Sequence, residues 1–238
     1  MRRAGLVLLA LALAGCETTA QKSATLERAA LRKAHGVAKA RGLTIHGQSR
    51  AVDVVSSTIL HSPEGTAAVL TLRNRSGRAV DDSPLLISVR ASNGSIIYSN
   101  DVSGLAHSLV SAPLIPPHGE VTWIDDQVQS PSTAAGVTAR IGEGTSLGGP
   151  VPRIDVEGGR LVREAGSASA EGTATNRSGV EQKELSVYAI ALRAGRTVAA
   201  GRAVLPTLAA HGSAHFQIYF IGDPVGARLQ LSAPATSG

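Results

Sequence analysis

The sequence contains one cysteine and very few aromatic residues. Cys16 is the only thiol among 238 residues, and the aromatic residues are one Trp, two Phe and three Tyr. A single thiol cannot close a disulfide within the chain, so burial alone must hold any folded part together. Proteins that bind nucleic acid typically carry a basic folded surface with stacking aromatic rings. This composition therefore argues against a nucleic-acid partner.

The sequence also lacks a hydrophobic run long enough to cross a membrane. The apolar run at residues 6–14 is much shorter than the roughly 20 residues that a spanning helix needs. It follows Arg2 and Arg3, as the apolar region of a signal peptide follows its basic start. The run ends in Leu13, Ala14, Gly15 and Cys16.

This ending resembles a lipobox, the cleavage and acylation signal of bacterial lipoproteins. The resemblance implies that residues 1–15 are removed as a signal peptide and that lipid is attached to Cys16. We therefore expect an exported protein that its acyl chains anchor to a membrane. It would lie on the periplasmic or extracytoplasmic face, and in the outer membrane of a cell with two membranes. An ordinary signal peptide followed by a chance cysteine is the alternative.

The formal net charge of +5 is unevenly spread along the chain. Residues 22–50 hold seven basic residues and one acidic residue. Residues 51–148 hold five basic and nine acidic residues, and residues 149–238 hold nine basic and seven acidic residues. We predict that residues 16–49 form a lipid-anchored basic stalk, which either lies against anionic head groups or is simply solvated. Within it, residues 23–41 favour a marginal helix outside any core, because its apolar face is mostly Ala.

From about residue 50 the hydrophobic pattern changes to a period of two, which is typical of strands. Asn93 and Gly94 between two β-rich runs are a strong hairpin signal. Short strands separated by turn signals indicate a β-sandwich. The predicted strands of this region cover residues 52–60, 67–72, 85–90, 96–98, 121–124 and 137–141.

Three landmarks of this region recur later in the same order. The first is an Asn-Arg-Ser-Gly turn, at residues 74–77 and again at 176–179. The second is a Gly hairpin, at residues 93–94 and 194–195. The third is a His-Gly turn before an aromatic strand, at residues 118–123 and 211–216. Trp123 and Phe216 occupy the same position and are predicted to anchor the two cores. A period near 100 residues indicates duplication of a whole domain. We predict β-sandwiches at residues 50–143 and 153–234, joined by a Gly-rich linker at residues 144–152.

The order of these landmarks resembles the FxLYD-type and related immunoglobulin-like modules of small bacterial lipoproteins. The name-giving motif is present only in part, at residues 185–188. The resemblance implies an all-β fold of two tandem immunoglobulin-like β-sandwiches after a signal peptide and a short helical or disordered stalk. It also implies an envelope location, but no activity, since such modules share none.

Two patterns suggest catalysis or metal binding at first sight. Residues 144–148 match the G-x-S-x-G motif of hydrolases, which needs a strand before the Ser and a helix after it. Gly149 and Pro150 follow, so no helix can start there. His211 and His215 are four residues apart and could face one metal, but His118 occupies the same turn as His211, which favours a turn role for both.

The paired carboxylates Asp81–Asp82 and Asp125–Asp126 could in principle bind Ca²⁺. Calcium loops need several oxygen ligands at set spacing, and no such run is present. We therefore expect these residues to form a solvated acidic surface. The sequence predicts no metal and no cofactor.

The preferred function is that of a non-catalytic binding or assembly module in the cell envelope. It would present its sandwiches to an envelope protein or a cell-wall polymer, through the long connection at residues 102–117 and through exposed sheet edges. The connection could equally be an insertion without function.

Two other functions remain possible from the sequence. The alternative is a ligand-holding lipoprotein subunit associated with a transporter, which would need a buried face between the modules; a free Gly-rich linker would count against it. An enzyme would need converging His, Asp and Ser residues, and a grouping of Asp101, His107 and Ser108 is arbitrary from sequence alone.

Overall fold

The computed structural model describes residues 19–34, 43, 45–102, 104–130, 133–164 and 167–237. These residues form an all-β protein with several sheets, which confirms the all-β part of the predicted fold class. The helices of this part are α1 (Thr19–Ala34) and the short 3-10 helix η1 (His107–Leu109). Neither is long and apolar enough to cross a membrane. Cys16 and the predicted signal peptide lie outside the described residues, and so does the part of the predicted stalk helix beyond Ala34.

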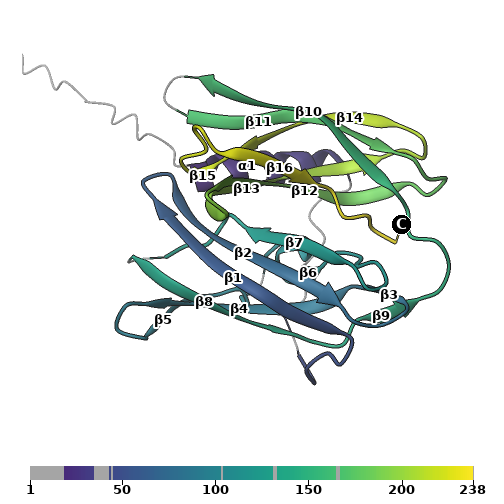
Figure 1. Ribbon diagram of the computed structural model, residues 1–238, viewed down its shortest axis with the longest axis horizontal. Coiled ribbons are helices and arrows are strands. Elements are labelled where there is room, and N and C mark those ends of the chain that lie inside the picture. The colour runs from purple at the N-terminus through teal and green to yellow at the C-terminus, as the bar shows by residue number, and fades with distance from the viewer. Residues whose placement is uncertain are drawn as a thin grey trace, which may run out of the picture.

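Most of the strands form two pairs of stacked sheets, seen as four layers in Figure 1. The N-terminal sheet pair consists of the three-stranded sheet β1-β2-β7 and a facing sheet in which β4 pairs with β5, β6 and β8. Its strands are β1 (Val52–Ser62), β2 (Gly65–Asn74), β4 (Ser83–Ala91), β5 (Ile96–Ser99), β6 (Ser111–Ala112), β7 (Glu120–Asp125) and β8 (Ala134–Ile141).

The C-terminal sheet pair repeats this arrangement. The sheet β10-β11-β14 faces the sheet β15-β13-β12-β16 across a second apolar core. Its strands are β10 (Ile154–Glu164), β11 (Ser167–Asn176), β12 (Gln182–Arg193), β13 (Arg196–Leu208), β14 (Ser213–Tyr219), β15 (Ile221–Gly222) and β16 (Arg228–Ser232).

The two sheet pairs pack directly against each other through their inner sheets. Tyr188 of β12 and Ala200 of β13 are fully buried in the same apolar cluster as Trp123 of the N-terminal pair. Strand β12 is therefore covered on both faces. Its continuous apolar run, residues 187–192, is the sequence pattern expected of such a strand.

The Asn turns make the same hydrogen bonds in both sheet pairs. Asn74 pairs with Val52 and Asn176 with Ile154, at equivalent ends of β1-β2 and β10-β11. The Asn74 side-chain amide donates to the Arg78 carbonyl at 2.7 Å, and two further carbonyls accept from it. Asn176 makes the same three kinds of contact, with its shortest bond also 2.7 Å. Each side chain therefore holds three backbone segments together.

The His-Gly turns are also equivalent. His118 and His211 have φ angles of 53° and 59°, in the left-handed region that a turn requires. Their backbone N–H groups donate to the carbonyls of Ser76 and Ser178 at 3.2 and 3.1 Å. The predicted turn role of both histidines is confirmed. Each turn leads into the strand that carries the core aromatic residue.

Trp123 and Phe216 lie at matching places in these strands. Trp123 pairs with Leu70 of β2, and Phe216 pairs with Gly172 of β11. Both rings are buried, as predicted for core anchors. Gly172 is needed beside the Phe216 ring, because an added Cβ would lie 2.7 Å from the ring edge.

The predicted linker is partly a strand. Residues 145–147 form β9 (Thr145–Leu147), which pairs with β3 (Ala79–Asp81). The prediction of a Gly-rich linker without regular structure is therefore wrong for residues 145–147. Gly144 permits the close approach, since a Cβ there would lie 2.2 Å from the Ser83 hydroxyl. Ser146 lies inside β9 and the next element is strand β10, so the G-x-S-x-G residues do not form a strand-turn-helix elbow.

Helix α1 packs onto the body, contrary to the expectation of a marginal helix outside the core. It contacts β13 and β14 of the C-terminal pair and β2 of the N-terminal pair. Ser23, Ala24 and Glu27 are buried by these contacts. The sequence argument failed because it counted only apolar area, whereas the helix is held largely by polar and charged side chains.

Candidate functional site

The most unusual site in the described residues is a buried cluster of charges where α1 meets both sheet pairs. We call it the junction cluster. It contains one cation, three carboxylates and four neutral polar side chains, namely Arg202, Glu27, Asp125, Asp126, Ser23, Tyr98, Ser108 and Gln127. The members come from α1, from β5, from η1, from the end of β7 with its following loop, and from β13.

Arg202 is the centre of the cluster. Its side chain is 1% exposed, and its Nη2 lies 2.5 Å from the Glu27 Oε2, which is itself on a buried side chain. Nη1 donates to the Ser108 hydroxyl at 2.9 Å, and Nε lies 3.6 Å from the Asp126 Oδ1. Arg202 therefore joins the helix to both sheet pairs.

Asp126 accepts hydrogen bonds from a backbone N–H group as well as from a side-chain hydroxyl. Its Oδ2 accepts from the Ser23 hydroxyl at 2.6 Å and from the Arg202 backbone N–H at 3.1 Å. The second bond satisfies a backbone donor of β13. Asp126 thus connects the end of the N-terminal pair to the helix and to β13.

Asp125 lies next to it and is fully buried. It accepts from the Tyr98 hydroxyl at 3.0 Å and from the Gln127 backbone N–H at 2.9 Å. Burial raises the pKa of Asp125 to about 6, although the Gln127 N–H and the charge of Arg202 oppose the shift. Burial and the Asp125 carboxylate raise the pKa of Tyr98 as well.

The charges of the cluster do not balance if every carboxylate is ionised. Burial raises the pKa of Glu27, and the nearby Arg202 charge only partly offsets this. Burial acts to lower the pKa of Arg202, but the carboxylates of Glu27 and Asp126 outweigh it, so this pKa lies above its ordinary value. The guanidinium therefore keeps its charge, while burial opposes the ionisation of Glu27 and Asp125.

Three buried polar atoms of the cluster lack a hydrogen-bond partner within the described chain. They are Glu27 Oε1, Asp126 Oδ1 and Arg202 Nε. The guanidinium of Arg202 and the Asp126 Oδ1 therefore interact through charge rather than through a formed hydrogen bond. Breaking such a buried ion pair from one side is costly, because it leaves the other charge buried without compensation.

The expectation of a solvated acidic surface is wrong for Asp125 and Asp126, which are 0% and 1% exposed. Asp82, in contrast, is exposed and accepts from the Ser111 hydroxyl at 2.7 Å. His107 Nε2 lies 2.8 Å from the same carboxylate oxygen. No described group of three or more His, Cys, Asp and Glu residues has the arrangement of a metal site.

The remaining candidate residues are separated by the fold. Ser108 turns toward Arg202, whereas the neighbouring His107 turns toward Asp82, so these residues do not form a catalytic triad. His215 contacts the Thr173 hydroxyl at 3.0 Å on the strand face. It makes no contact of this kind with His211, whose role is in the turn.

The long connection, residues 102–117, turns largely inward. Leu109, Leu114 and Ile115 are almost completely buried. The Asn100 amide, just before the connection, donates to the Leu109 carbonyl at 2.7 Å, and the Trp123 indole donates to the Ser108 carbonyl at 2.9 Å. The connection can therefore serve as a contact surface only in part, because the exposed ones among its described residues are Val102, Gly104, His107 and Pro117.

The sequence did not reveal the junction cluster, although one signal was present. Glu27 is the single acidic residue among seven basic ones in residues 22–50. An isolated acid in a basic helix suggests a specific partner, but it does not identify Arg202. Only the fold brings these two residues together.

Comparisons with known proteins show no family. No family model matches the chain, and no curated protein matches it. A solved structure of a red sea bream transglutaminase aligns with 78% of this chain and 30% of that one, at 15% identity and a TM-score of 0.22. A likeness at this level carries no argument about fold or activity.

Proposed function

We propose that the chain is an exported, non-catalytic lipoprotein, anchored through lipid on Cys16, that serves as a binding or assembly module in the cell envelope. Its two sheet pairs would be tandem immunoglobulin-like sandwiches. The lipobox-like sequence supports the anchor, and the recurring Asn and His turns support the duplication. The junction cluster adds a new element, because it makes the two sandwiches and the helix after the anchor one body.

The observation that carries this proposal is the ion pair between Glu27 and Arg202. Glu27 lies 11 positions after the proposed lipid attachment site, and Arg202 lies on the inner sheet of the C-terminal pair. A force on the anchor therefore reaches the body at the junction of both sheet pairs. That arrangement suits a module that presents a rigid surface close to a membrane.

We place the partner surface at the free edge of β5 and the exposed start of the long connection. Ile96 and Val102 are 55% and 52% exposed, among the most exposed large apolar residues that the structure describes. β5 pairs with β4 on one side only, so its other backbone edge can accept a strand from a partner. In the C-terminal pair, β13 is followed directly by the turn before β14, so no segment there corresponds to the long connection. This surface therefore occurs only in the first half.

Crosslinking in native envelopes tests this proposal. The anchored wild-type protein should capture a discrete envelope protein or cell-wall fragment, and the double variant Ile96→Asp and Val102→Asp should capture at least tenfold less. Val180→Asp is the matched control, since Val180 is 41% exposed and lies in the C-terminal pair. Equal capture by all three proteins would refute the assigned surface.

The anchor is tested in the same preparation. Cys16→Ala should lose incorporation of labelled fatty acid and leave the membrane fraction. Persistence of the variant in the membrane would show that Cys16 is not the anchor.

The alternative of a ligand-holding transporter subunit needs a buried face between the modules. Such a face exists, but Tyr188, Ala200 and Trp123 belong to one packed apolar cluster there. A ligand would have to displace these side chains. Tight binding of a small molecule by the purified protein, with no captured partner, would favour this alternative over the assembly module.

A further inference from the structure

Helix α1 begins at one end of the body, which we call the anchor end. Lys22, in its first turn, places its Nζ 5.9 Å from the centre of the Tyr219 ring, at the end of β14. Figure 1 shows the purple helix starting near β15 and near the tip of the β1-β2 hairpin. The first described helical residue, Thr19, therefore lies at the anchor end.

Hydrogen bonds and strand pairs fix the other elements of the anchor end. The Gly222 N–H donates to the Ser62 hydroxyl at 3.2 Å, which joins β15 to the β1-β2 hairpin. Gly222 also pairs with Ala199 near the start of β13. Arg193 lies 3.7 Å from Asp223, so the β12-β13 hairpin belongs to the same end.

Few residues separate the anchor end from the proposed lipid. Cys16 is three positions before Thr19, and three residues span at most about 11 Å when fully extended. Electrostatic attraction acts over about 8 Å at physiological salt. Thr19 is therefore tethered within about 11 Å of the proposed lipid, a distance comparable to the range over which charged head groups attract side chains.

The charges of the anchor end suit an anionic surface. Four exposed arginines and one lysine occupy its segments, against three acidic residues; they are Lys22, Arg163, Arg193, Arg196 and Arg228, against Glu64, Glu164 and Asp223. The opposite end differs in degree, because several of its arginines pair with acids, whereas Arg193 is the one arginine of the anchor-end set that pairs with an acid within the described residues. Arg177 lies 2.9 Å from Asp155 there, and Arg75 pairs with Asp53 in the same way.

We propose that the anchor end rests on the membrane surface, with its arginines against anionic phospholipid head groups, so that the body has a fixed orientation. This rests on lipidation of Cys16 in the function proposed above. The tips of the β1-β2 and β12-β13 hairpins then face the lipid. The Asn and His turns at the other end point away from the membrane.

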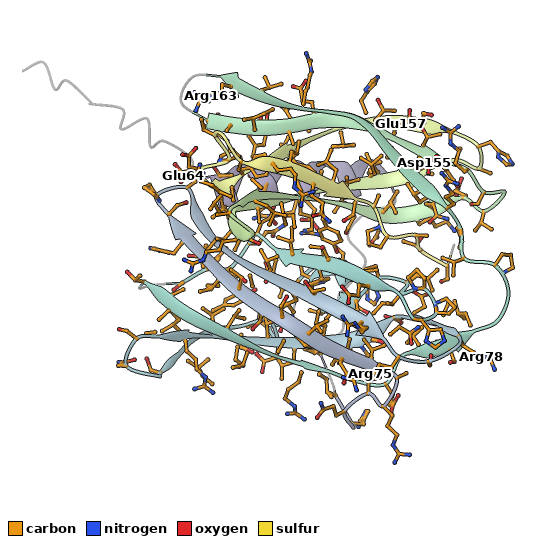
Figure 2. All side chains as sticks on the ribbon, in the orientation of Figure 1. Glu64, Arg75, Arg78, Asp155, Glu157 and Arg163 are labelled. Carbon is orange, nitrogen blue, oxygen red and sulfur yellow. The ribbon has the colours of Figure 1, made fainter. Side chains whose placement is uncertain are left out.

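Energy transfer between one labelled residue and the bilayer tests the orientation. Acylation consumes the thiol of Cys16, so Glu64→Cys or Arg78→Cys adds a unique labelling site to the full acylated chain. Figure 2 shows Glu64 at the anchor end and Arg78 at the opposite end. In vesicles that contain phosphatidylglycerol, a donor at position 64 should transfer to head-group acceptors at least twice as efficiently as a donor at position 78.

Two results would overturn the proposal in distinguishable ways. Equal transfer from both positions in fully acylated protein would refute the orientation and leave the lipid anchor standing. Absence of acyl label on Cys16, with the protein outside the vesicle fraction, would refute both the anchor and the orientation.

Neutral substitutions test the role of charge. With the label at position 64, Arg193→Gln, Arg196→Gln and Arg228→Gln together should remove the difference between phosphatidylglycerol and phosphatidylcholine vesicles. Each arginine near an anionic surface strengthens the attraction about fivefold. Arg75→Gln with Arg177→Gln is the matched control at the opposite end and should retain the difference. Retention of the difference in the triple variant would refute the electrostatic contact.

Discussion

Glu27 of α1 and Arg202 of β13 are separated by 175 positions in the sequence, yet their side chains meet at 2.5 Å in the interior. The pair connects the segment after the proposed anchor to the inner sheet of the second half. Asp126 extends the connection to the first half through the Arg202 backbone N–H.

Removal of the Glu27 carboxylate should destabilise the whole body. Glu27→Ala leaves the Arg202 charge buried without its nearest partner, and we expect the free energy of unfolding to fall by about 3 kcal/mol. Urea denaturation followed by circular dichroism measures this. Thr25→Ala is the control, because Thr25 is exposed on the same helix. A loss no larger than that of the control would contradict a buried, stabilising ion pair.

Stability should depend on pH through Asp125. Its pKa is raised from 3.8 to about 6 in the folded protein, so the folded state binds the proton more tightly than the unfolded state. This stabilisation is complete below pH 3.8 and is lost as the pH rises through 6. The raised pKa of Glu27 acts in the same direction. Between pH 7 and pH 5 the free energy of unfolding should therefore increase.

Asp125→Asn removes the Asp125 part of this dependence, which amounts to about 3 kcal/mol at most. Urea midpoints at pH 5 and pH 7 should lie closer together in this variant than in the wild type. Asp223→Asn is the control at an exposed carboxylate. An unchanged urea midpoint of the wild-type protein at both pH values would show that the pKa of Asp125 is not raised in the folded state.

The two Asn turns should contribute similar amounts. Asn74→Ala and Asn176→Ala each remove a side chain that donates to three carbonyls, and each should cost about 1–3 kcal/mol. Their effects should add, because the two sites share no partner. Thermal denaturation of the single and double variants measures this. Asn93→Ala, at an exposed hairpin, should change stability little, and an equal loss there would contradict the special role of the turns.

Alternation and turn chemistry predicted most of the strands of the N-terminal sheet pair. The runs at residues 52–60, 67–72 and 121–124 lie within β1, β2 and β7. These strands could be predicted because the alternation of apolar residues and the turn residues that define them lie close together in the sequence. The short strands β3, β6, β9 and β15 escaped prediction, since two or three paired residues leave no periodic pattern.

The relation between the sheet pairs could not be predicted in the same way. The apolar residues 187–192 fit a strand buried on both faces, but they do not identify the sheet that covers the second face. The Asp125–Asp126 pair misled the sequence argument, because adjacent carboxylates are ordinarily solvated. Their burial depends on Arg202, whose position only the tertiary fold determines.

Amide hydrogen exchange in the full acylated protein tests the central claim that α1 locks the anchored segment onto both sheet pairs. The amides of α1 should be protected about as strongly as those of β13, and Glu27→Ala should lower the protection of α1 more than that of β13. Exchange of α1 at the rate of an unstructured peptide in the wild-type protein, beside a well-protected β13, would show that the helix is not docked and would contradict the account.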